Sequence, residues 1–464
     1  MDLLEYIVRN KNAKLPMHMP GHKRNASLAP YLAKLAADCD MTEIEGFDNL
    51  HGAEGVLREG MDRMAALWGS KQAFWLVNGS TCGILAGIRA ALPEGGRAIV
   101  ARNCHGSVYN GLLLRHARPV YLIPEIDAGT GISGALKPMD VSAALERNPD
   151  AKLVILTSPT YEGVVSDIEA ISRIAHTKGV PVLVDEAHGA HLGFGCGFPG
   201  GALAGGADIA IHSLHKTLPS LTQTAALHLK GDLIEKNAVA QALSIFETSS
   251  PSYLLMASIS GCTALVEERG RDLFEEWRDR LTRFSRRAEG MQNLSLFKSP
   301  WTRDPSKLVV CTAKTTLTGA ALSDLLRHKH HIEVELACTR HIVAMTGMGD
   351  TADALDAFAD ALLAIDEGTE PCAPTPFPLP TIPGRALAPW ETENRRKKAA
   401  RLCEALGRVS AETVWAYPPG IPLLLPGEEL TQDIVEYMQY SIGEGIHLKS
   451  SSDLLPERIL TLAE

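Results

Sequence analysis

Short apolar segments alternate with segments of helical periodicity through the first half of the chain. Between residues 53 and 68 the apolar side chains recur every three or four positions, which predicts a helix. Short apolar runs then follow at intervals, and such runs are typical of strands that are buried on both faces of a parallel sheet. They cover residues 73–77, 98–100, 120–123, 153–157, 182–185, 209–213 and 224–228. This alternation predicts an α/β fold with a mostly parallel central sheet and helices on both faces.

The pattern changes after residue 250. Residues 252–291 have the spacing of long helices, and a smaller α/β unit is expected from residue 307 to residue 365. Prolines crowd residues 371–389, where neither regular helix nor sheet can continue, so we expect a linker there. The predicted parts are an N-terminal arm (1–50), a large domain (51–300), a small α/β domain (301–370), a proline-rich linker (371–390) and a C-terminal domain (391–464).

Composition narrows the class of protein. The 464-residue chain has a net charge of −10, which argues against nucleic acid or an anionic membrane surface as its main partner. No run approaches the roughly 20 apolar residues of a membrane span, and the first residues lack the pattern of a secretory signal. Nine cysteines, an odd number without a CxxC pair, fit free thiols better than disulfides or a zinc site. We therefore expect a cytoplasmic protein.

One lysine and one aspartate stand where chemistry is expected. Asp185 ends the run at 182–185, and Lys216 follows the run at 209–213. Ligand groups of α/β folds lie at the carboxyl ends of strands, so both side chains should be near the same edge of the sheet. Pyridoxal phosphate needs such a pair, because a lysine holds its aldehyde as a Schiff base and a carboxylate keeps its pyridine nitrogen protonated. The ordinary alternatives are a surface lysine and an aspartate that caps a helix.

A turn far upstream is suited to a phosphate group. Gly79, Ser80 and Thr81 lie between a predicted strand and a predicted helix, where backbone N–H groups and the helix dipole favour an anion. Ser213 and His215, close to Lys216, could add further phosphate contacts. The alternative is an ordinary Asn-Gly-Ser turn.

Two histidines are further candidates for the site. His105 follows a strand by a few residues and could stack on a cofactor ring, although a solvated loop histidine is the more common case. His188 could reach the phenolic oxygen of the cofactor or act as an acid near the substrate's α-carbon. The cluster of His328, His330 and His331 lacks nearby carboxylate or cysteine ligands before Glu333, so we expect a solvated turn and no metal site.

Taken together, these segments resemble the Orn/Lys/Arg decarboxylase family, which comprises pyridoxal-phosphate enzymes of the aspartate aminotransferase fold (fold type I). The resemblance covers nearly the whole chain, and its motifs occur in the family's order. The matching segments are residues 20–23, 78–81, 104–107, 157–163, 185–189, 213–216, 222–225, 417–422 and 426–428. The chain resembles the shorter members, often arginine decarboxylases, which lack the N-terminal wing domain of the larger ones.

The resemblance implies a role for each candidate residue. Lys216 would carry the cofactor, Asp185 would pair with its ring nitrogen, and His105 would stack on the ring. The remaining implied contacts are His188 with the phenolic oxygen, and Ser80, Thr81, Ser213 and His215, with Gly79 at the same turn, for the phosphate. The implied reaction is decarboxylation of a basic amino acid, arginine before lysine or ornithine, in a homodimer or a higher homo-oligomer.

Several alternatives stay open from the sequence. An aminotransferase-like reaction on the same fold would need a residue to hold the substrate carboxylate in the ring plane, and Arg340 is the candidate. A non-catalytic homologue with a binding or regulatory role is the second alternative. The acidic residue that meets the distal cation of the substrate is not decided, and the candidates are Glu162, Glu333, Glu335 and Glu428.

Overall fold

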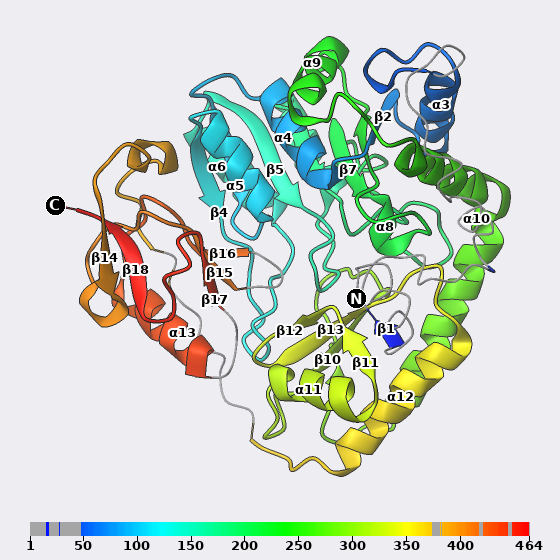
Figure 1. The fold of residues 1–464 in the computed structure, drawn as a ribbon, viewed down its shortest axis with the longest axis vertical. Helices are drawn as coiled ribbons and strands as arrows, with labels where there is room; N and C mark the ends of the chain where they lie inside the picture. Colours follow the sequence, from blue (N-terminus) through cyan, green and yellow to red (C-terminus); the bar gives the residue numbers. More distant parts are fainter. Residues whose placement is uncertain are drawn as a thin grey trace, which may run out of the picture.

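A seven-stranded sheet forms the centre of the large domain in the computed structural model (Figure 1), which describes residues 15–17, 27, 48–373, 381, 383–416, 421–443 and 448–463. Its strands are ordered β2-β8-β7-β6-β5-β3-β4. They are β2 (Gln72–Leu76), β3 (Arg97–Ala101), β4 (Arg118–Leu122), β5 (Ala151–Thr157), β6 (Val182–Asp185), β7 (Ile209–Ser213) and β8 (Ala225–Leu229). Only β8 runs antiparallel to its neighbours, β2 and β7, in this sheet. The mostly parallel sheet predicted from the apolar runs is therefore confirmed.

Helices pack around this sheet. They are α3 (Val56–Trp68), α4 (Gly79–Ala91), α5 (Gly106–Leu114), α6 (Pro138–Arg147), α7 (Ile168–Thr177), α8 (Leu214–Thr217) and α9 (Lys236–Phe246). Helix α4 lies against β2, β8, β7 and β6, with α5 and α9 beside it, while α6 pairs with α7 and contacts β3 and β4. Glycines let α4 approach the sheet closely, because a Cβ at Gly83 would lie 2.6 Å from Leu76 and one at Gly87 would lie 2.8 Å from Leu183.

A single long helix leads to a smaller sheet. Helix α10 (Tyr253–Ala288) has 36 residues, where the sequence predicted more than one helix. The antiparallel sheet that follows has the order β12-β13-β10-β9, with α11 (Gly319–Lys329) and α12 (Ala352–Glu367) beside it. Its strands are β9 (Ser295–Leu296), β10 (Lys307–Cys311), β12 (Leu336–Ala337) and β13 (His341–Met345). Near it, β1 (Leu15–Met17) pairs in parallel with β11 (Ile332–Val334). Helix α12 packs along α10 (Figure 1).

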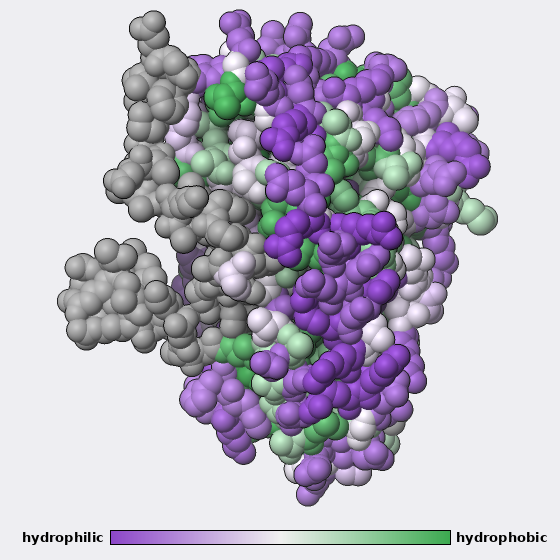
Figure 2. Space-filling view, turned by 90° about the vertical axis from the view of Figure 1, so that its right-hand side faces the viewer, coloured by the Kyte–Doolittle hydropathy of each residue, from purple (hydrophilic) through white to green (hydrophobic). Residues whose placement is uncertain are grey.

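The surface that carries α10 is mainly hydrophilic (Figure 2). Exposed ion pairs join α10 to its neighbours, among them Arg63–Glu267 and Arg283–Asp356. Ion pairs at such exposed positions contribute little to the stability of the fold. None of the described helices combines the length and the apolar composition that crossing a bilayer requires.

The C-terminal part has a hydrophobic core of its own, whereas the large and small sheets share one continuous core. A separate, smaller cluster covers the other face of the small sheet and includes Val309, Cys311 and Val343. The C-terminal part contains η3 (Pro389–Thr392), β14 (Lys397–Arg401), η4 (Leu402–Glu404), β15 (Val414–Ala416), β16 (Ile421–Leu424), α13 (Gln432–Gly443), β17 (Leu448–Ser450) and β18 (Arg458–Leu462). Strands β14 and β18 pair with each other, and β15 lies between β16 and β17. The predicted domain boundaries stay predictions.

A buried ion pair joins this part to the large domain. Arg102, which follows β3, donates to Glu428 at 3.1 Å, and only 4% and 2% of the two side chains are exposed. Arg102 also donates to the carbonyl of Pro422 at 2.8 Å. This ion pair therefore fixes the C-terminal part to the large domain at Arg102, which precedes His105 by three residues.

Some predicted features lie outside the described residues. These are most of the N-terminal arm, including residues 20–23, much of the proline-rich linker, and residues 417–420 of the C-terminal motif.

Candidate active site

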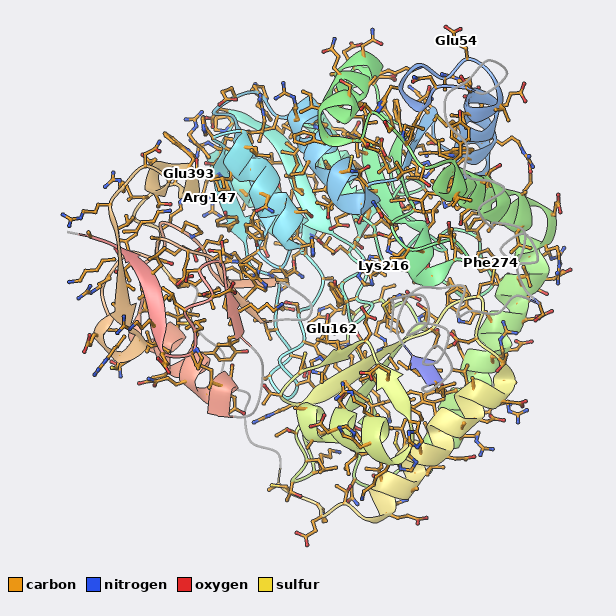
Figure 3. All side chains as sticks on the ribbon, viewed as in Figure 1. Glu54, Arg147, Glu162, Lys216, Phe274 and Glu393 are labelled. Atoms are coloured by element: carbon orange, nitrogen blue, oxygen red, sulfur yellow. The ribbon has the colours of Figure 1, made fainter. Side chains whose placement is uncertain are left out.

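One pocket lies at the carboxyl ends of β3, β5, β6 and β7. Figure 3 shows Lys216 and Glu162 in the central region of the molecule, between the large and the small sheet. The lining residues are Ser80, Ile84, Asn103, His105, Thr157, Thr160, Tyr161, Asp185, Ala187, His188 and Lys216.

Asp185 is a buried carboxyl group at the end of β6. Only 2% of it is exposed, and its Oδ1 accepts a hydrogen bond from the N–H of Ala187 at 3.2 Å. Burial raises the pKa of Asp185, while the charges of His105 and Lys216 act to lower it. Among the residues that the structure describes, no cation forms an ion pair with Asp185. A buried carboxylate is costly without a cationic partner, so this position is suited to a protonated ligand nitrogen.

Lys216 lies in the short helix α8, directly after β7. Its Nζ is 2.9 Å from Nε2 of His188 and 5.6 Å from the centre of the Tyr161 ring. Burial lowers the pKa of Lys216, and the charge of Asp185 partly opposes this effect. An amine with a lowered pKa loses its proton more readily and becomes a better nucleophile.

His188 is buried beside Lys216 and stays neutral near pH 7. Burial and then the positive charges of Lys216 and Lys307 hold the pKa of His188 well below its usual range. Its ring lies 4.2 Å from the ring of Tyr161, measured between centres. A neutral imidazole whose Nε2 accepts a hydrogen bond from Lys216 carries its own proton on Nδ1. The arrangement therefore makes His188 a hydrogen-bond partner of the Lys216 amine.

His105 lies in the pocket wall at the start of α5. Its Nδ1 accepts a hydrogen bond from the N–H of Ser107 at 3.2 Å, so the side chain caps the helix. Burial lowers the pKa of His105. The capping bond fixes the ring of His105 in the pocket wall. The side chain is therefore not the solvated loop histidine that is the more common case.

The turn at Gly79 has the features of an anion site. Gly79 has φ +76°, a conformation that favours glycine, and Asn78 makes no side-chain bond that would cap α4. The first N–H groups of α4 are therefore available, and the hydroxyls of Ser80 and Ser213 lie 2.9 Å apart at the same end. Thr81 follows in the first turn of α4 and is exposed.

The structure gives His215 another contact. Its Nδ1 lies 2.8 Å from the carbonyl oxygen of Thr224, to which it donates, and the side chain is not among those that line the pocket.

The four acidic candidates for the distal cation of the substrate differ in their contacts within the structure. Glu333 is paired with Arg327 at 2.7 Å, and Glu428 with Arg102. Glu162 is buried, accepts from the Thr160 hydroxyl at 3.0 Å and lies 3.8 Å from Nε2 of His341. Glu335 is half-buried, and its charge acts to raise the pKa of Lys216.

Arg340, the candidate carboxylate ligand of an aminotransferase, donates to the carbonyl oxygen of Gly129 at 3.2 Å. It is not among the residues that line the pocket.

Sequence reasoning missed residues that support the pocket from behind. Asp304 and Lys307 lie fully buried behind the His188 segment, and His191 contacts Asp304. One signal could have identified them. Lys307 begins the buried run at 307–311 and Asp304 precedes it by three residues, and a charge in or beside a buried run is costly unless it is paired.

A buried acid behind the anion site leads to a pH-dependent prediction. Glu247 accepts from the N–H of Val77 at 2.6 Å, and burial raises its pKa to about 7, against 4.5 for the free side chain. The folded protein therefore binds this proton more tightly than the unfolded chain. The resulting stabilisation is complete below pH 4.5 and is lost as the pH rises to 7. At pH 8 the deficit amounts to about 3 kcal/mol.

Glu247→Gln keeps the acceptor oxygen but removes the charge. We expect it to increase the free energy of unfolding by about 2–3 kcal/mol at pH 8 and by less than about 1 kcal/mol at pH 5. Urea unfolding of both proteins across this pH range measures the difference. A difference that is the same at every pH would contradict the assignment.

Comparison with known proteins agrees with the geometry. Residues 2–305 match the family model of the Orn/Lys/Arg decarboxylase major domain, and residues 385–445 match that of the Orn/Lys/Arg decarboxylase C-terminal domain. The chain is 34% identical to an arginine decarboxylase of Bacillus subtilis, over 96% of this chain and 94% of that protein. It is 30% identical to an arginine decarboxylase of Bacillus anthracis, over 100% of this chain and 96% of that protein.

A solved structure has the same fold. The lysine decarboxylase of Francisella novicida superposes with a TM-score of 0.80 at 16% identity, over 96% of this chain and 77% of that one. The fold is therefore that of the fold type I pyridoxal-phosphate enzymes, with smaller C-terminal sheets.

The residues of the pocket fit pyridoxal phosphate. The Lys216 amine, whose pKa is lowered, suits the aldehyde of the cofactor. Asp185, a buried carboxyl group without an ion-pair partner among the described residues, suits the ring nitrogen. The start of α4, with open N–H groups, suits the phosphate. The pocket, the fold and the family models, which together match most of the chain, lead to one conclusion. This protein belongs to the Orn/Lys/Arg decarboxylase family, whose cofactor is pyridoxal phosphate.

Proposed function

We propose that this protein is an arginine decarboxylase that uses pyridoxal phosphate. The observation that carries the proposal is the close set of Lys216, His188 and Asp185 in one buried pocket, in a chain 30–34% identical to arginine decarboxylases over nearly its full length. The expected products are carbon dioxide and agmatine, a polyamine-type amine. Lysine and ornithine are the next candidate substrates.

Each pocket residue has a proposed task. Bound pyridoxal phosphate supplies an aldehyde that links to amines and a ring that withdraws the electrons left when carbon dioxide departs. Lys216 holds the cofactor between turnovers and offers an amine of lowered pKa. Asp185 holds a proton at the pyridine nitrogen, and His105 covers the ring. The start of α4, with Ser80 and Ser213, holds the phosphate.

Lys216 and His188 are the proposed pair for proton transfer to the α-carbon. Their nitrogens are 2.9 Å apart, so a proton can pass directly between them. The neutral state of His188 lets it accept that proton from the lysine. The burial of the pocket residues limits the access of water, which favours reaction on the bound substrate.

The surroundings of the pocket favour decarboxylation over transamination. Arg340 is the candidate to hold a carboxylate in the ring plane, but it contacts the carbonyl of Gly129 and does not line the pocket. For the distal guanidinium of arginine, Glu162 and Glu335 are the proposed partners, because Glu162 bonds to the pocket residue Thr160 and the charge of Glu335 acts on Lys216.

We further propose a cytoplasmic homodimer or higher homo-oligomer. In the part of the chain that the structure describes, eight cysteines are free thiols, which suits a reducing compartment. The proposed assembly rests on the resemblance to a family that builds its sites across a dimer interface. Sedimentation of the purified protein with pyridoxal phosphate measures the assembly.

The test of the function is product analysis. The purified protein is incubated with pyridoxal phosphate and, separately, with arginine, lysine and ornithine, and the products are identified by mass spectrometry. We expect agmatine from arginine, whereas cadaverine or putrescine as the main product would reassign the substrate. Keto acids would favour the aminotransferase alternative. Inertness toward all amino acids, with cofactor bound at Lys216, would favour a non-catalytic role.

A further inference from the structure

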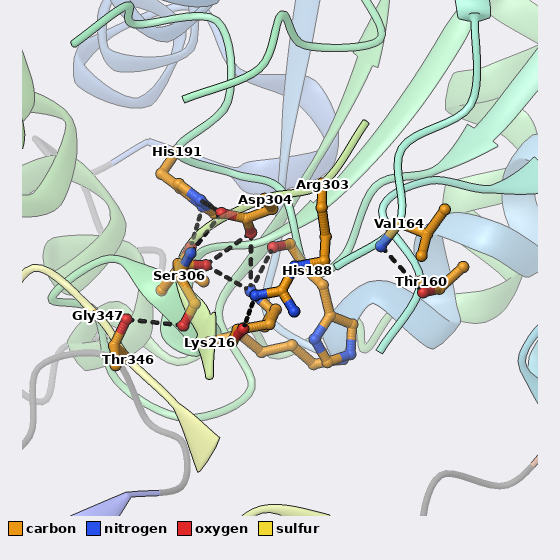
Figure 4. A network of polar contacts seen from close by, with 12 residues as sticks. Thr160, Val164, His188, His191, Lys216, Arg303, Asp304, Ser306, Thr346 and Gly347 are labelled. Atoms are coloured by element: carbon orange, nitrogen blue, oxygen red, sulfur yellow. Dashed lines mark hydrogen bonds and ion pairs between the residues drawn. The ribbon is translucent and has the colours of Figure 1, made fainter. Parts of the chain in front are cut away.

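A buried ion pair of Asp304 and Lys307 lies behind the pocket, and its contacts reach the segments that carry His188 and Lys216. Figure 4 shows Asp304, Ser306 and His191 in this network, with His188 and Lys216 close by. Lys307, the first residue of β10, is completely buried. Its Nζ donates to the carbonyl oxygen of His188 at 3.2 Å, to Asp304 Oδ2 at 3.1 Å and to Ser306 Oγ at 3.0 Å. Three acceptors match the three N–H bonds of an ammonium group, so the buried charge is fully satisfied.

Asp304 extends this network to helix α8. It is also completely buried, and its Oδ1 accepts from the N–H of Ser306 at 2.9 Å and from Nε2 of His191 at 3.2 Å. Although burial acts to raise it, the pKa of Asp304 is held well below its usual range by Lys307 and His191. Nδ1 of His191 lies 3.2 Å from the hydroxyl of Thr217, the residue after Lys216.

The segments around the pair leave room for it. Gly163 has φ +88°, and a Cβ there would lie 2.9 Å from the carbonyl oxygen of Asp304 and 3.0 Å from Cγ of Lys307. Only glycine meets both demands without strain. The loop after β5, the loop after β6 and the start of β10 therefore pack closely around two buried charges.

We propose that Asp304 and Lys307 are positioning residues of the active site. Lys307 holds the backbone of His188, and Asp304 holds helix α8 through His191 and Thr217. Together they set the separation between His188 and Lys216. The inference rests on the proposed function for the identity of the reaction, but the geometry it describes is a property of the protein itself.

The charges of Lys307 and Asp304 also affect the pKa of His188. In the described part of the chain, the groups that face this imidazole are Lys216 from α8, Lys307 and Asp304 from the small domain, His105 from the start of α5, and Tyr161 from the loop after β5. Lys216, Lys307 and His105 lower the pKa of His188 together with burial, and Asp304 raises it. Removal of the Lys307 charge should therefore make His188 easier to protonate.

The decisive variant is Lys307→Met, which keeps the aliphatic stem and removes the ammonium group. In the protein without cofactor, NMR of labelled histidines should show the midpoint of His188 rising by about one pH unit or more. The signal is assigned by its loss in His188→Gln. In the protein with cofactor, kcat should fall roughly 10- to 100-fold, the scale observed for outer partners of functional histidines, with a smaller change in KM.

Arg283→Met is the control. It removes an exposed ion pair with Asp356, between α10 and α12, and should leave both the His188 midpoint and kcat unchanged. Thr217→Val serves as the second variant, because it leaves the buried pair of Asp304 and Lys307 in place. It deletes only the hydroxyl that faces His191, and kcat should fall several-fold while the His188 midpoint stays the same.

Two results would overturn the proposal. One is a folded Lys307→Met protein with an unchanged His188 midpoint and a kcat within twofold of the parent. The other, if Lys307→Met does not fold, is a Thr217→Val protein that works at the parent rate. The NMR titration needs no turnover, so it still tests the arrangement if arginine proves not to be the substrate.

Discussion

Lys216→Ala is expected to abolish the decarboxylation of arginine, with a loss on the order of 10⁴-fold or more, the scale seen when an enzyme loses its covalent nucleophile. The reason lies in the pocket, where Lys216 offers an amine of lowered pKa 2.9 Å from His188. Alanine removes both the attachment point of the cofactor and one member of the proton-transferring pair. Steady-state rates of agmatine formation measure the loss.

A second measurement separates the chemistry from the fold. Borohydride reduction of the parent protein with pyridoxal phosphate should leave the cofactor on the peptide that contains Lys216, and this label should be absent in Lys216→Ala. Lys178→Ala, at the exposed end of α7, is the control and should keep both the label and the rate. More than a trace of turnover by Lys216→Ala would refute the role of this lysine.

Asp185→Ala is expected to bind pyridoxal phosphate but to lose most of its rate, by about 10²- to 10³-fold, as when one preorganised electrostatic contact is removed. Asp185 is buried at the end of β6, and the charges of His105 and Lys216 oppose the effect of burial on its pKa. Its carboxylate can therefore hold a proton on the pyridine nitrogen, which alanine cannot do. Asp185→Asn, which keeps an acceptor for the N–H of Ala187, should lose a similar share of the rate.

The neighbouring residue supplies a matched control. Glu186 is as buried as Asp185, but it bonds to His212 at 2.8 Å and does not line the pocket. Glu186→Gln should therefore keep a rate close to that of the parent. Retention of a near-normal rate by Asp185→Asn would show that the charge at this position is not needed.

The network behind the pocket explains how two distant parts of the chain serve one site. Lys307 meets the His188 carbonyl across 119 positions of sequence, and Asp304 meets His191 across 113. The segment at the start of the small sheet therefore contributes to the site through buried charges. Loss of either charge leaves the other unpaired in the core, which is the costly way to break a buried pair.

The local pattern of the sequence was sufficient for the central elements. Apolar runs predicted the strands that end at Thr157, Asp185 and Ser213, because a strand buried on both faces must be apolar throughout. The placement of Asp185 and Lys216 at one edge followed, since parallel strands present their carboxyl ends together. The roles considered for His105 and His188 became specific only through the family resemblance, because a loop histidine is more often solvated.

The sequence by itself therefore determined the α/β class, the mostly parallel sheet and the neighbourhood of Asp185 and Lys216, because these depend on periodicity within a few residues. Only the tertiary structure decided which distant charges meet. It paired Glu428 with Arg102, directed Arg340 to Gly129 and buried Lys307 against Asp304 and His188. Such pairings depend on how separate elements pack, and a charged residue beside an apolar run does not specify its partner.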